Sequence, residues 1–312
     1  MIKPKPLTPG DTVAILATSG PCNPEKLTKG INTIKSMGLV PIVMDSCYHQ
    51  HGGYLAGEDW LRLKNIHTAF AMPKVCGIFA ARGGYGAARL LPKLDYELIT
   101  NNPKIFVGYS DVTALHIALN QRCKLITYHG PMPAADFGCE VNPYTLNSLK
   151  QMIFSDDIAI PSQLNNSSTS LDKPLITIVP GHATGPLIGG NLSILASLIG
   201  TPYEPDTRGC ILFLEETNEP PYIIDRLLLQ LKQSGKLKDA AGIILGDFSP
   251  ESYESLYIPI NELITTEGKP TIAGLVCGHT SPTLTLPLGH VVELDASSAA
   301  NMLLCTQHHI TS

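Results

Sequence analysis

The sequence predicts an α/β protein with two domains: an N-terminal doubly wound, mostly parallel sheet and a smaller C-terminal α/β domain with a mixed sheet. Short apolar runs without polar alternation, such as TVAILA at 12–17, are separated by longer amphipathic stretches. This is the pattern of buried parallel strands alternating with helices. The length of 312 residues favours two domains over one. A segment with little periodic apolar content, 155–172, divides the chain.

The N-terminal domain is expected over 1–154 and the C-terminal domain over 173–312, with 155–172 as the linker. Asn23 and Pro24 predict the start of the first helix, because Asn caps helices and Pro suits the first helical position. Gly38 ends it. The other expected helices cover 58–70, 191–198 and 222–234. The expected strands cover 12–17, 40–44, 75–80, 105–107, 211–214, 241–245, 271–275 and 291–294.

Composition excludes several classes of protein. Hydrophobic residues make up 44% of the chain and charged residues 16%, which is incompatible with a disordered protein. Lys and Arg number 22 against 27 Asp and Glu, without long runs, so a nucleic-acid-binding surface is not expected. No apolar stretch approaches the roughly 18 residues of a membrane-spanning helix. The apolar part of the first 20 residues is short and is preceded by Pro6, Pro9 and Asp11, so it predicts a strand rather than a signal peptide.

The cysteines and histidines do not form metal-binding patterns. The eight cysteines include no CxxC pair, and the ten histidines include no HxxxH pair. We therefore expect neither a disulfide framework nor a zinc site, and no cofactor. Cysteines used as small core residues indicate a reducing, cytoplasmic location.

A serine follows the strand predicted at 105–107, in the segment KIFVGYSDVTALHIALN. A serine at a tight turn from strand to helix resembles a nucleophile elbow, in which neighbouring N–H groups stabilise an oxyanion. The segment has Val112 where the usual G-x-S-x-G pattern has its second glycine. The alternative is that Ser110 or Asp111 only caps the helix, and from this segment alone capping is favoured.

A glycine-rich loop, ARGGYGAARLL at 81–91, follows the strand predicted at 75–80. Its spacing does not match a dinucleotide-binding or phosphate-binding loop. It could supply an oxyanion donor or hold a substrate carboxylate, because glycines allow close approach to the backbone. The alternative is an ordinary tight turn.

Two more candidate groups follow predicted strands in the C-terminal domain. Glu215 and Glu216 come at the end of ILFL, where α/β sheets keep their sites, although exposed loop charges are the commoner case. His279 lies in a loop rich in Thr and Pro. Ser110, an acidic residue and His279 then occur in the chain order of α/β hydrolases, so the combination predicts nucleophilic catalysis.

These motifs together resemble the LD-carboxypeptidase family of serine peptidases, which also includes microcin C immunity peptidases. The resemblance runs nearly end to end. It rests on LAGEDWLRL, ARGGYGAARLL, VGYSDVTAL, HGPM, GGNLSILASLIGTPY, LFLEETNEPPYIIDR, GIILGDF and GHTSPTLTLPLG. It implies a two-domain fold with the active site at the domain interface.

The resemblance also implies roles for individual residues. Ser110 is expected to be the nucleophile, Glu215 the triad acid and His279 the general base, with Glu216 in a loop role. The expected oxyanion donors are backbone N–H groups near Gly84 and of Asp111. Arg82 and Arg226 are the candidates for binding the substrate carboxylate, each with a structural or surface role as the alternative.

The implied reaction is hydrolysis of the amide between meso-diaminopimelate and terminal D-alanine in murein tetrapeptides, by a cytoplasmic homodimer. An immunity peptidase that cleaves aminoacyl-nucleotide analogues is a close alternative, because it shares the triad. A non-catalytic small-molecule binding protein is a more distant alternative, which depends on the glycine loop alone.

Overall fold

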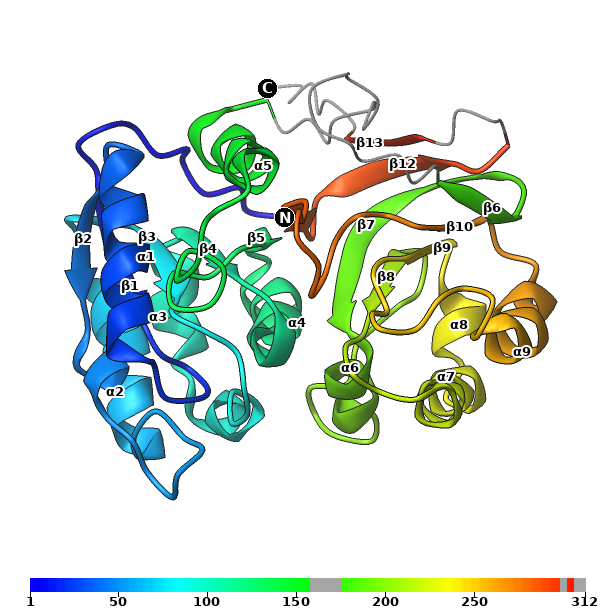
Figure 1. The fold of residues 1–312 in the computed structure, drawn as a ribbon, viewed down its shortest axis with the longest axis horizontal. Coiled ribbons are helices and arrows are strands. Elements are labelled where there is room, and N and C mark those ends of the chain that lie inside the picture. Colours follow the sequence, from blue (N-terminus) through cyan, green and yellow to red (C-terminus); the bar gives the residue numbers. More distant parts are fainter. Residues whose placement is uncertain (158–174, 298–301, 306–312) are drawn as a thin grey trace. The chain divides into compact units, whose positions relative to one another are not determined.

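The protein is described by a computed structural model that covers residues 1–157 and 175–297, and the backbone of 302–305. The chain divides into two compact units, each with its own sheet (Figure 1). The first contains residues 1–156 and 285–287, and the second contains 157–284 and 288–312. Most of the predicted linker, 155–172, lies outside the described residues.

The first unit is built on a six-stranded sheet in the order β11-β5-β4-β3-β1-β2. Strands β1 to β5 pair in parallel. Because β1 lies between β2 and β3, the chain winds outward in both directions, and the predicted doubly wound sheet is confirmed. The strands are β1 (Thr12–Leu16), β2 (Val40–Val43), β3 (Val75–Ala80), β4 (Ile105–Gly108), β5 (Thr127–His129) and β11 (Leu286–Leu288).

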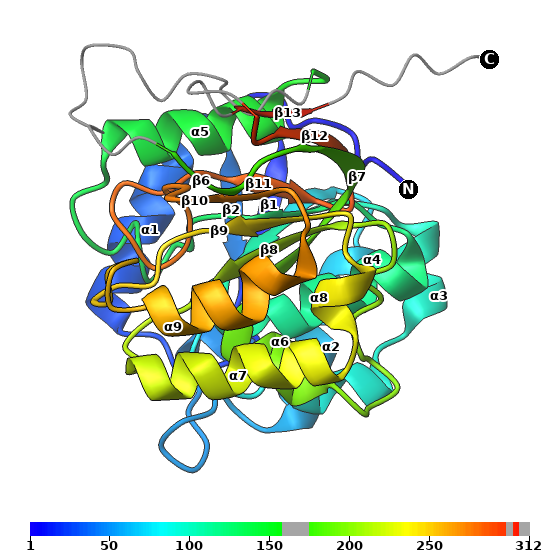
Figure 2. The same ribbon diagram turned by 90° about the vertical axis from the view of Figure 1, so that its right-hand side faces the viewer.

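Helices cover both faces of this sheet. Helix α2 packs against α3, and α3 packs against α4. Figure 2 shows these three helices across the sheet from α1, as right-handed crossovers require. The helices are α1 (Pro24–Ser36), α2 (Asp59–Ala71), α3 (Tyr96–Asn101), α4 (Thr113–Cys123) and α5 (Pro143–Phe154), with short 3₁₀ turns η1 (Asp45–Tyr48), η2 (Ala88–Lys93) and η3 (Ser110–Val112).

Local sequence explains the clearest of these elements. The Asn23 side chain accepts a hydrogen bond from the Lys26 N–H at 3.0 Å and so caps α1, as predicted. Gly38 follows the helix with φ of +85°, a conformation that favours glycine. The core of the sheet is apolar: Val13, Ala14 and Ile15 of β1 are fully buried.

The second unit has a seven-stranded mixed sheet in the order β13-β12-β7-β8-β9-β10-β6. Strands β7 to β10 are parallel, and β6, β12 and β13 are antiparallel to their neighbours. The strands are β6 (Ile176–Val179), β7 (His182–Asn191), β8 (Ile211–Glu215), β9 (Gly242–Leu245), β10 (Thr271–Ala273), β12 (Val291–Asp295) and β13 (Met302–Cys305).

The helices of the second unit gather beneath its parallel strands. Both views show α7 and α9 on the same face of the sheet, and α7 also contacts α6 and α8 (Figures 1 and 2). The bounds are α6 (Leu192–Leu198), α7 (Pro221–Gln233), α8 (Lys236–Asp239) and α9 (Tyr257–Pro259), continued by η4 (Ile260–Ile264) and η5 (Thr265–Glu267). Within the residues that the structure describes, no helix has the length and apolar character needed to cross a membrane.

A buried histidine on α4 connects this helix to the end of β4. His116 is fully buried, with Nε2 2.8 Å from the Gly108 carbonyl oxygen and Nδ1 2.8 Å from Thr127 Oγ1. The carbonyl can only accept, so Nε2 carries the proton of the neutral ring and Nδ1 accepts from the hydroxyl. Burial lowers the pKa of His116 to about 4.

The lowered pKa of His116 predicts a loss of stability in acid. The unfolded chain takes up this proton near pH 6.5, whereas the folded protein resists it down to about 4. The contribution of neutral His116 to the free energy of unfolding is therefore fully present above pH 6.5. It falls by about 3 kcal/mol as the pH approaches 4. Urea unfolding at pH 7 and pH 4 should show this fall in the wild type, and a reduced fall in His116→Gln. An equal fall in both proteins would contradict it.

Candidate active site

The backbone at Ser110 has a conformation that non-glycine residues rarely adopt. Strand β4 ends at Gly108, and Ser110 has φ of +64° where η3 begins. A left-handed residue of this kind is strained and tends to occur at functional sites. The side chain is half-buried at the turn from β4 to α4. This geometry is that of the nucleophile elbow, and Val112 in place of the second glycine does not prevent it.

The capping alternative for Ser110 and Asp111 is wrong. Among the described residues, no side chain caps the start of η3 or of α4. The Asp111 carboxylate instead accepts a hydrogen bond from the Ala87 N–H at 2.8 Å, in the glycine loop. Burial raises the pKa of Asp111, and hydrogen bonds from Ser19, Ala87 and Gly86 oppose the shift.

The glycine loop lies directly against Ser110. A Cβ added to Gly83 would come within 2.8 Å of both Cβ and Oγ of Ser110, so glycine is required there by space alone. Gly84 has φ of +119°, and the Gly20 N–H donates to the Gly83 carbonyl at 3.0 Å. The loop leads into the 3₁₀ turn η2. The loop is therefore not followed directly by an α-helix whose dipole could assist it.

The two candidate arginines are held differently. Arg82, just before the glycine loop, donates from Nη1 to the Pro21 carbonyl at 2.9 Å and is partly exposed. Arg226 on α7 is exposed, and its guanidinium carbon lies 6.0 Å from the centre of the Tyr222 ring. The role of either arginine in binding a carboxylate stays a prediction.

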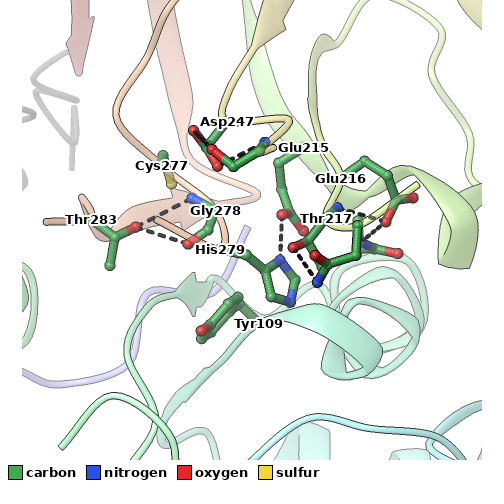
Figure 3. Close-up of polar contacts among 12 residues, drawn as sticks. Tyr109, Glu215, Glu216, Thr217, Asp247, Cys277, Gly278, His279 and Thr283 are labelled. Atoms are coloured by element: carbon green, nitrogen blue, oxygen red, sulfur yellow. Dashed lines mark hydrogen bonds and ion pairs between the residues drawn. The ribbon is translucent and has the colours of Figure 1, made fainter. Parts of the chain in front are cut away.

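In the second unit, a buried carboxylate and a histidine form a hydrogen-bonded pair. Glu215 Oε2 lies 2.7 Å from His279 Nδ1 (Figure 3). The Glu215 side chain is fully buried at the end of β8, while the His279 side chain is 20% exposed. A carboxylate on Nδ1 fixes the tautomer in which Nε2 can accept a proton. The pair therefore has the arrangement of an acid that orients a general base.

The loop that carries His279 is shaped to let the pair form. A Cβ on Gly278 would come within 2.8 Å of Glu215 Oε2, and the φ of this glycine is +124°. Its N–H donates to Thr283 Oγ1, and the Thr283 hydroxyl is in turn 3.2 Å from the Gly278 carbonyl (Figure 3). The Asp247 N–H donates to the Cys277 carbonyl at 2.9 Å, which fixes the loop to the end of β9.

Glu216 is also buried, so the expectation of an exposed loop charge is wrong. Its carboxylate accepts from Asn191 Nδ2 at 2.9 Å and from the backbone N–H and hydroxyl of Ser193 at 2.8 and 2.6 Å. Its own N–H donates to the Asp247 carbonyl at 3.0 Å. Glu216 thus holds the start of α6 against the end of β8.

The candidate residues fall into two groups, one in each unit. Ser110, Asp111, Arg82 and Gly84 belong to the first unit, and Glu215, His279 and Arg226 belong to the second. The structure brings Ser110 to the glycine loop and His279 to Glu215. Sequence reasoning missed Arg62, which is fully buried beside the glycine loop. In 1–157 and 175–297, no three His, Cys, Asp or Glu side chains cluster as metal ligands would.

Burial raises the pKa of Glu215, and the hydrogen bond from His279 only partly opposes this. The folded protein thus binds a proton here more tightly than the unfolded chain does. The buried charge then costs stability as the pH rises through the raised pKa, by about 1.4 kcal/mol for each unit of the shift.

Glu215→Gln keeps the shape and removes the charge. Its stability relative to the wild type should therefore rise between pH 4 and pH 8, as measured by urea unfolding. A stability difference that does not change with pH would contradict the conclusion that the hydrogen bond from His279 compensates the buried charge only in part.

Two long segments of the chain match the two domains of one known protein family. Residues 13–130 match the LD-carboxypeptidase N-terminal domain, and residues 184–294 match the LD-carboxypeptidase C-terminal domain. The chain is 42% identical over 294 residues to a probable murein peptide carboxypeptidase of Bacillus subtilis, covering 92% of this chain and 89% of that protein. It is 28% identical over 318 residues to the microcin C7 self-immunity protein MccF of Escherichia coli, covering 93% of this chain and 92% of that protein.

Solved structures give the same result. A muramoyltetrapeptide carboxypeptidase from Oxalobacter formigenes matches with a TM-score of 0.82 and 32% identity, over 94% of this chain and 97% of that one. MccF in complex with glutamyl sulfamoyl guanosine matches with a TM-score of 0.84 and 26% identity, over 99% of each chain. The family matches and the carboxypeptidase relatives agree. This chain belongs to the LD-carboxypeptidase family of peptidases.

Proposed function

We propose that this protein is a serine carboxypeptidase in which Ser110, Glu215 and His279 act together to release terminal D-alanine from murein tetrapeptides. The observation that carries the proposal is the 2.7 Å hydrogen bond between a fully buried carboxylate and a partly exposed imidazole. Such a pair prepares Nε2 to take a proton from a hydroxyl. The strained backbone at Ser110 supports the choice of that hydroxyl as the nucleophile.

In the proposed reaction, His279 Nε2 takes the Ser110 proton as Oγ attacks the carbonyl of the diaminopimelate L-centre. The negative charge forms on the oxygen of the attacked carbonyl, and the carboxylate of Glu215 stabilises the positive charge that forms on His279. The amide bond then breaks, His279 gives its proton to the departing D-alanine nitrogen, and an ester forms on Ser110. Water, deprotonated by His279, attacks the ester and restores the free hydroxyl.

The oxyanion of the tetrahedral intermediate requires N–H donors beside Ser110. We assign this role to the amide of Asp111 and to an amide of the glycine loop near Gly84. The Asp111 carboxylate accepts hydrogen bonds from Gly86 and Ala87, so the loop donor is sought within residues 83–85. Each donor is worth about 3 kcal/mol of transition-state stabilisation.

A carboxypeptidase must also recognise the free carboxylate of its substrate. Arg82 is the better of the two candidates, because it immediately precedes the glycine loop and its hydrogen bond to the Pro21 carbonyl is made by Nη1. A guanidinium can bind a carboxylate through two nitrogens at once. Arg226 is exposed and lies over Tyr222, so its position suits a surface role as well as it suits carboxylate binding.

The murein substrate is favoured over an aminoacyl-nucleotide analogue by the relatives. Identity is 42% with the probable murein peptide carboxypeptidase and 28% with MccF. The MccF structures nevertheless share the fold at TM-scores of 0.84 and 0.85. Mass spectrometry can compare loss of D-alanine from a synthetic tetrapeptide with cleavage of aspartyl sulfamoyl adenosine. Faster turnover of the nucleotide analogue would assign the immunity-type activity instead.

Recycling of murein peptides would place the enzyme in the cytoplasm. The cysteines at 22, 47, 76, 123, 139, 210 and 277 are free thiols, which suits a reducing compartment. Four of them are buried, as expected for small core residues, whereas Cys139 is exposed.

Removal of the Ser110 hydroxyl should abolish turnover without unfolding the protein. We expect Ser110→Ala and Ser110→Gly each to lose at least about 1,000-fold in kcat. The two variants should differ in stability, because glycine adopts φ of +64° without strain. Ser110→Gly should be more stable than Ser110→Ala by about 1 kcal/mol in urea unfolding. Activity near that of the wild type in either variant would refute the nucleophile assignment.

Gly83→Ala should impair the enzyme through contact with the nucleophile. The new methyl group would lie 2.8 Å from Ser110 Oγ, and a displacement of about 1 Å costs about 100-fold in kcat/KM. Gly77→Ala is the matched control, because the nearest neighbours of its added methyl would be the Leu7 and Val13 side chains, at 3.3 Å. It should affect stability and leave kcat/KM unchanged. Equal kinetics in both variants would contradict the close approach.

A further inference from the structure

Two buried side chains of opposite charge lie beside the glycine loop and take no part in the proposed chemistry. The Arg62 side chain on α2 is fully buried, and Asp111 is 2% exposed. A buried charge costs several kcal/mol unless hydrogen bonds and an opposite charge compensate it. The partners of these two groups therefore indicate what their burial achieves.

Arg62 connects the segment after β1 to the glycine loop. Its Nη1 donates to the Thr18 carbonyl and, at 2.9 Å, to the Gly86 carbonyl. Its Nη2 forms an ion pair with Asp59 one turn away on α2. A Cβ on Gly86 would come within 2.9 Å of Nη1, so glycine at this position makes the contact possible.

Asp111, the residue that follows the nucleophile, is hydrogen-bonded to the same loop. Its Oδ2 accepts from the Ala87 N–H at 2.8 Å, and the carboxylate also accepts from the Gly86 N–H and the Ser19 hydroxyl. Ser19 precedes Gly20, whose N–H donates to the Gly83 carbonyl at 3.0 Å. Both ends of the loop are thus fixed by hydrogen bonds.

The fixed points enclose the amides that are candidates for the oxyanion hole. Gly83 is held through its carbonyl, while Gly86 is held through both its carbonyl and its amide. Only residues 84 and 85 lie between them, with Gly84 at φ of +119°. A loop held in this way cannot shift its amides without straining or breaking the hydrogen bond to Gly20 at one end or those to Arg62 and Asp111 at the other.

We propose that Arg62 and Asp111 are positioning residues that fix the oxyanion-binding amides of the glycine loop relative to Ser110. The inference rests on the proposed function, because it requires that an oxyanion forms beside Ser110. Removing either group should lower kcat and leave KM nearly unchanged, since the loop amides bind the transition state more strongly than the substrate.

The principal variants are Arg62→Lys and Asp111→Asn. Lysine keeps the positive charge but lacks the two nitrogens that reach Gly86 and Asp59 together. Each variant should lose about 100-fold in kcat for tetrapeptide, with KM changed less than about threefold. The rate at which a fluorophosphonate labels Ser110 should fall by a similar factor, because the phosphoryl oxygen occupies the oxyanion position.

Lys104→Met is the matched control. Lys104 is a buried cation of the same unit, and its Nζ donates to the Ala69 and Met72 carbonyls at the end of α2. Its loss should lower stability and leave kcat and the labelling rate unchanged. If Arg62→Lys and Asp111→Asn behave like Lys104→Met, the two groups are merely structural and the inference is overturned.

A milder variant keeps the inference testable if the principal variants do not fold. Asp59→Asn removes the charged partner of Arg62 at a site where the Asp59 side chain is 25% exposed. It should lower kcat about three- to tenfold with KM unchanged, and an unchanged kcat would count against the inference. The proposed function fails separately: it is refuted if Ser110→Ala keeps its activity, whatever the Arg62 and Asp111 variants do.

Discussion

The hydrogen bond from His279 to a carboxylate without any solvent exposure is the interaction on which the proposed chemistry depends. Burial disfavours the charged form of Glu215, so the hydrogen-bond donor at 2.7 Å is needed to stabilise the carboxylate. The bond in turn fixes the imidazole ring and its tautomer. The site therefore gives up some stability in exchange for an oriented base, which is the usual relation between catalytic sites and folding.

Each unit uses a glycine to bring backbone against a reactive side chain. In the first unit, Gly83 lies so close to Ser110 that a Cβ would be 2.8 Å from the hydroxyl oxygen. In the second unit, Gly278 has the same relation to the Glu215 carboxylate. These contacts explain why glycines precede or face the reactive residues, since any side chain would displace the group that the chemistry needs.

The sequence predicted the elements whose signals are local. The apolar run ending at Ala17 and the Asn23-Pro24 pair specified β1 and the start of α1, and both are found in the structure. Strand β7 was not foreseen, because its polar start and the glycines at 189 and 190 hide the usual apolar pattern. Gly189 is needed there, since a Cβ would come within 1.9 Å of the Phe213 carbonyl of β8.

The candidate site was only partly accessible from sequence for the same reason. The placement of Ser110 and His279 after strands was visible, and so was the acidic pair that contains Glu215. The different functions of Glu215 and Glu216 depend on partners far along the chain, and no local pattern distinguishes them. Arg62 carried one signal that could have been used: it lies one turn before Ile66 on the buried face of α2, where a charge requires a partner.

The central claim is that the Ser110 hydroxyl is activated by His279, which Glu215 orients. The most direct measurement is the rate at which a fluorophosphonate reacts with the wild type and with His279→Ala, with the modified residue identified by peptide mass spectrometry. The account predicts a single adduct on Ser110 that forms at least about 100-fold more slowly without the imidazole. An adduct on another residue, or equal rates in the two proteins, would contradict it.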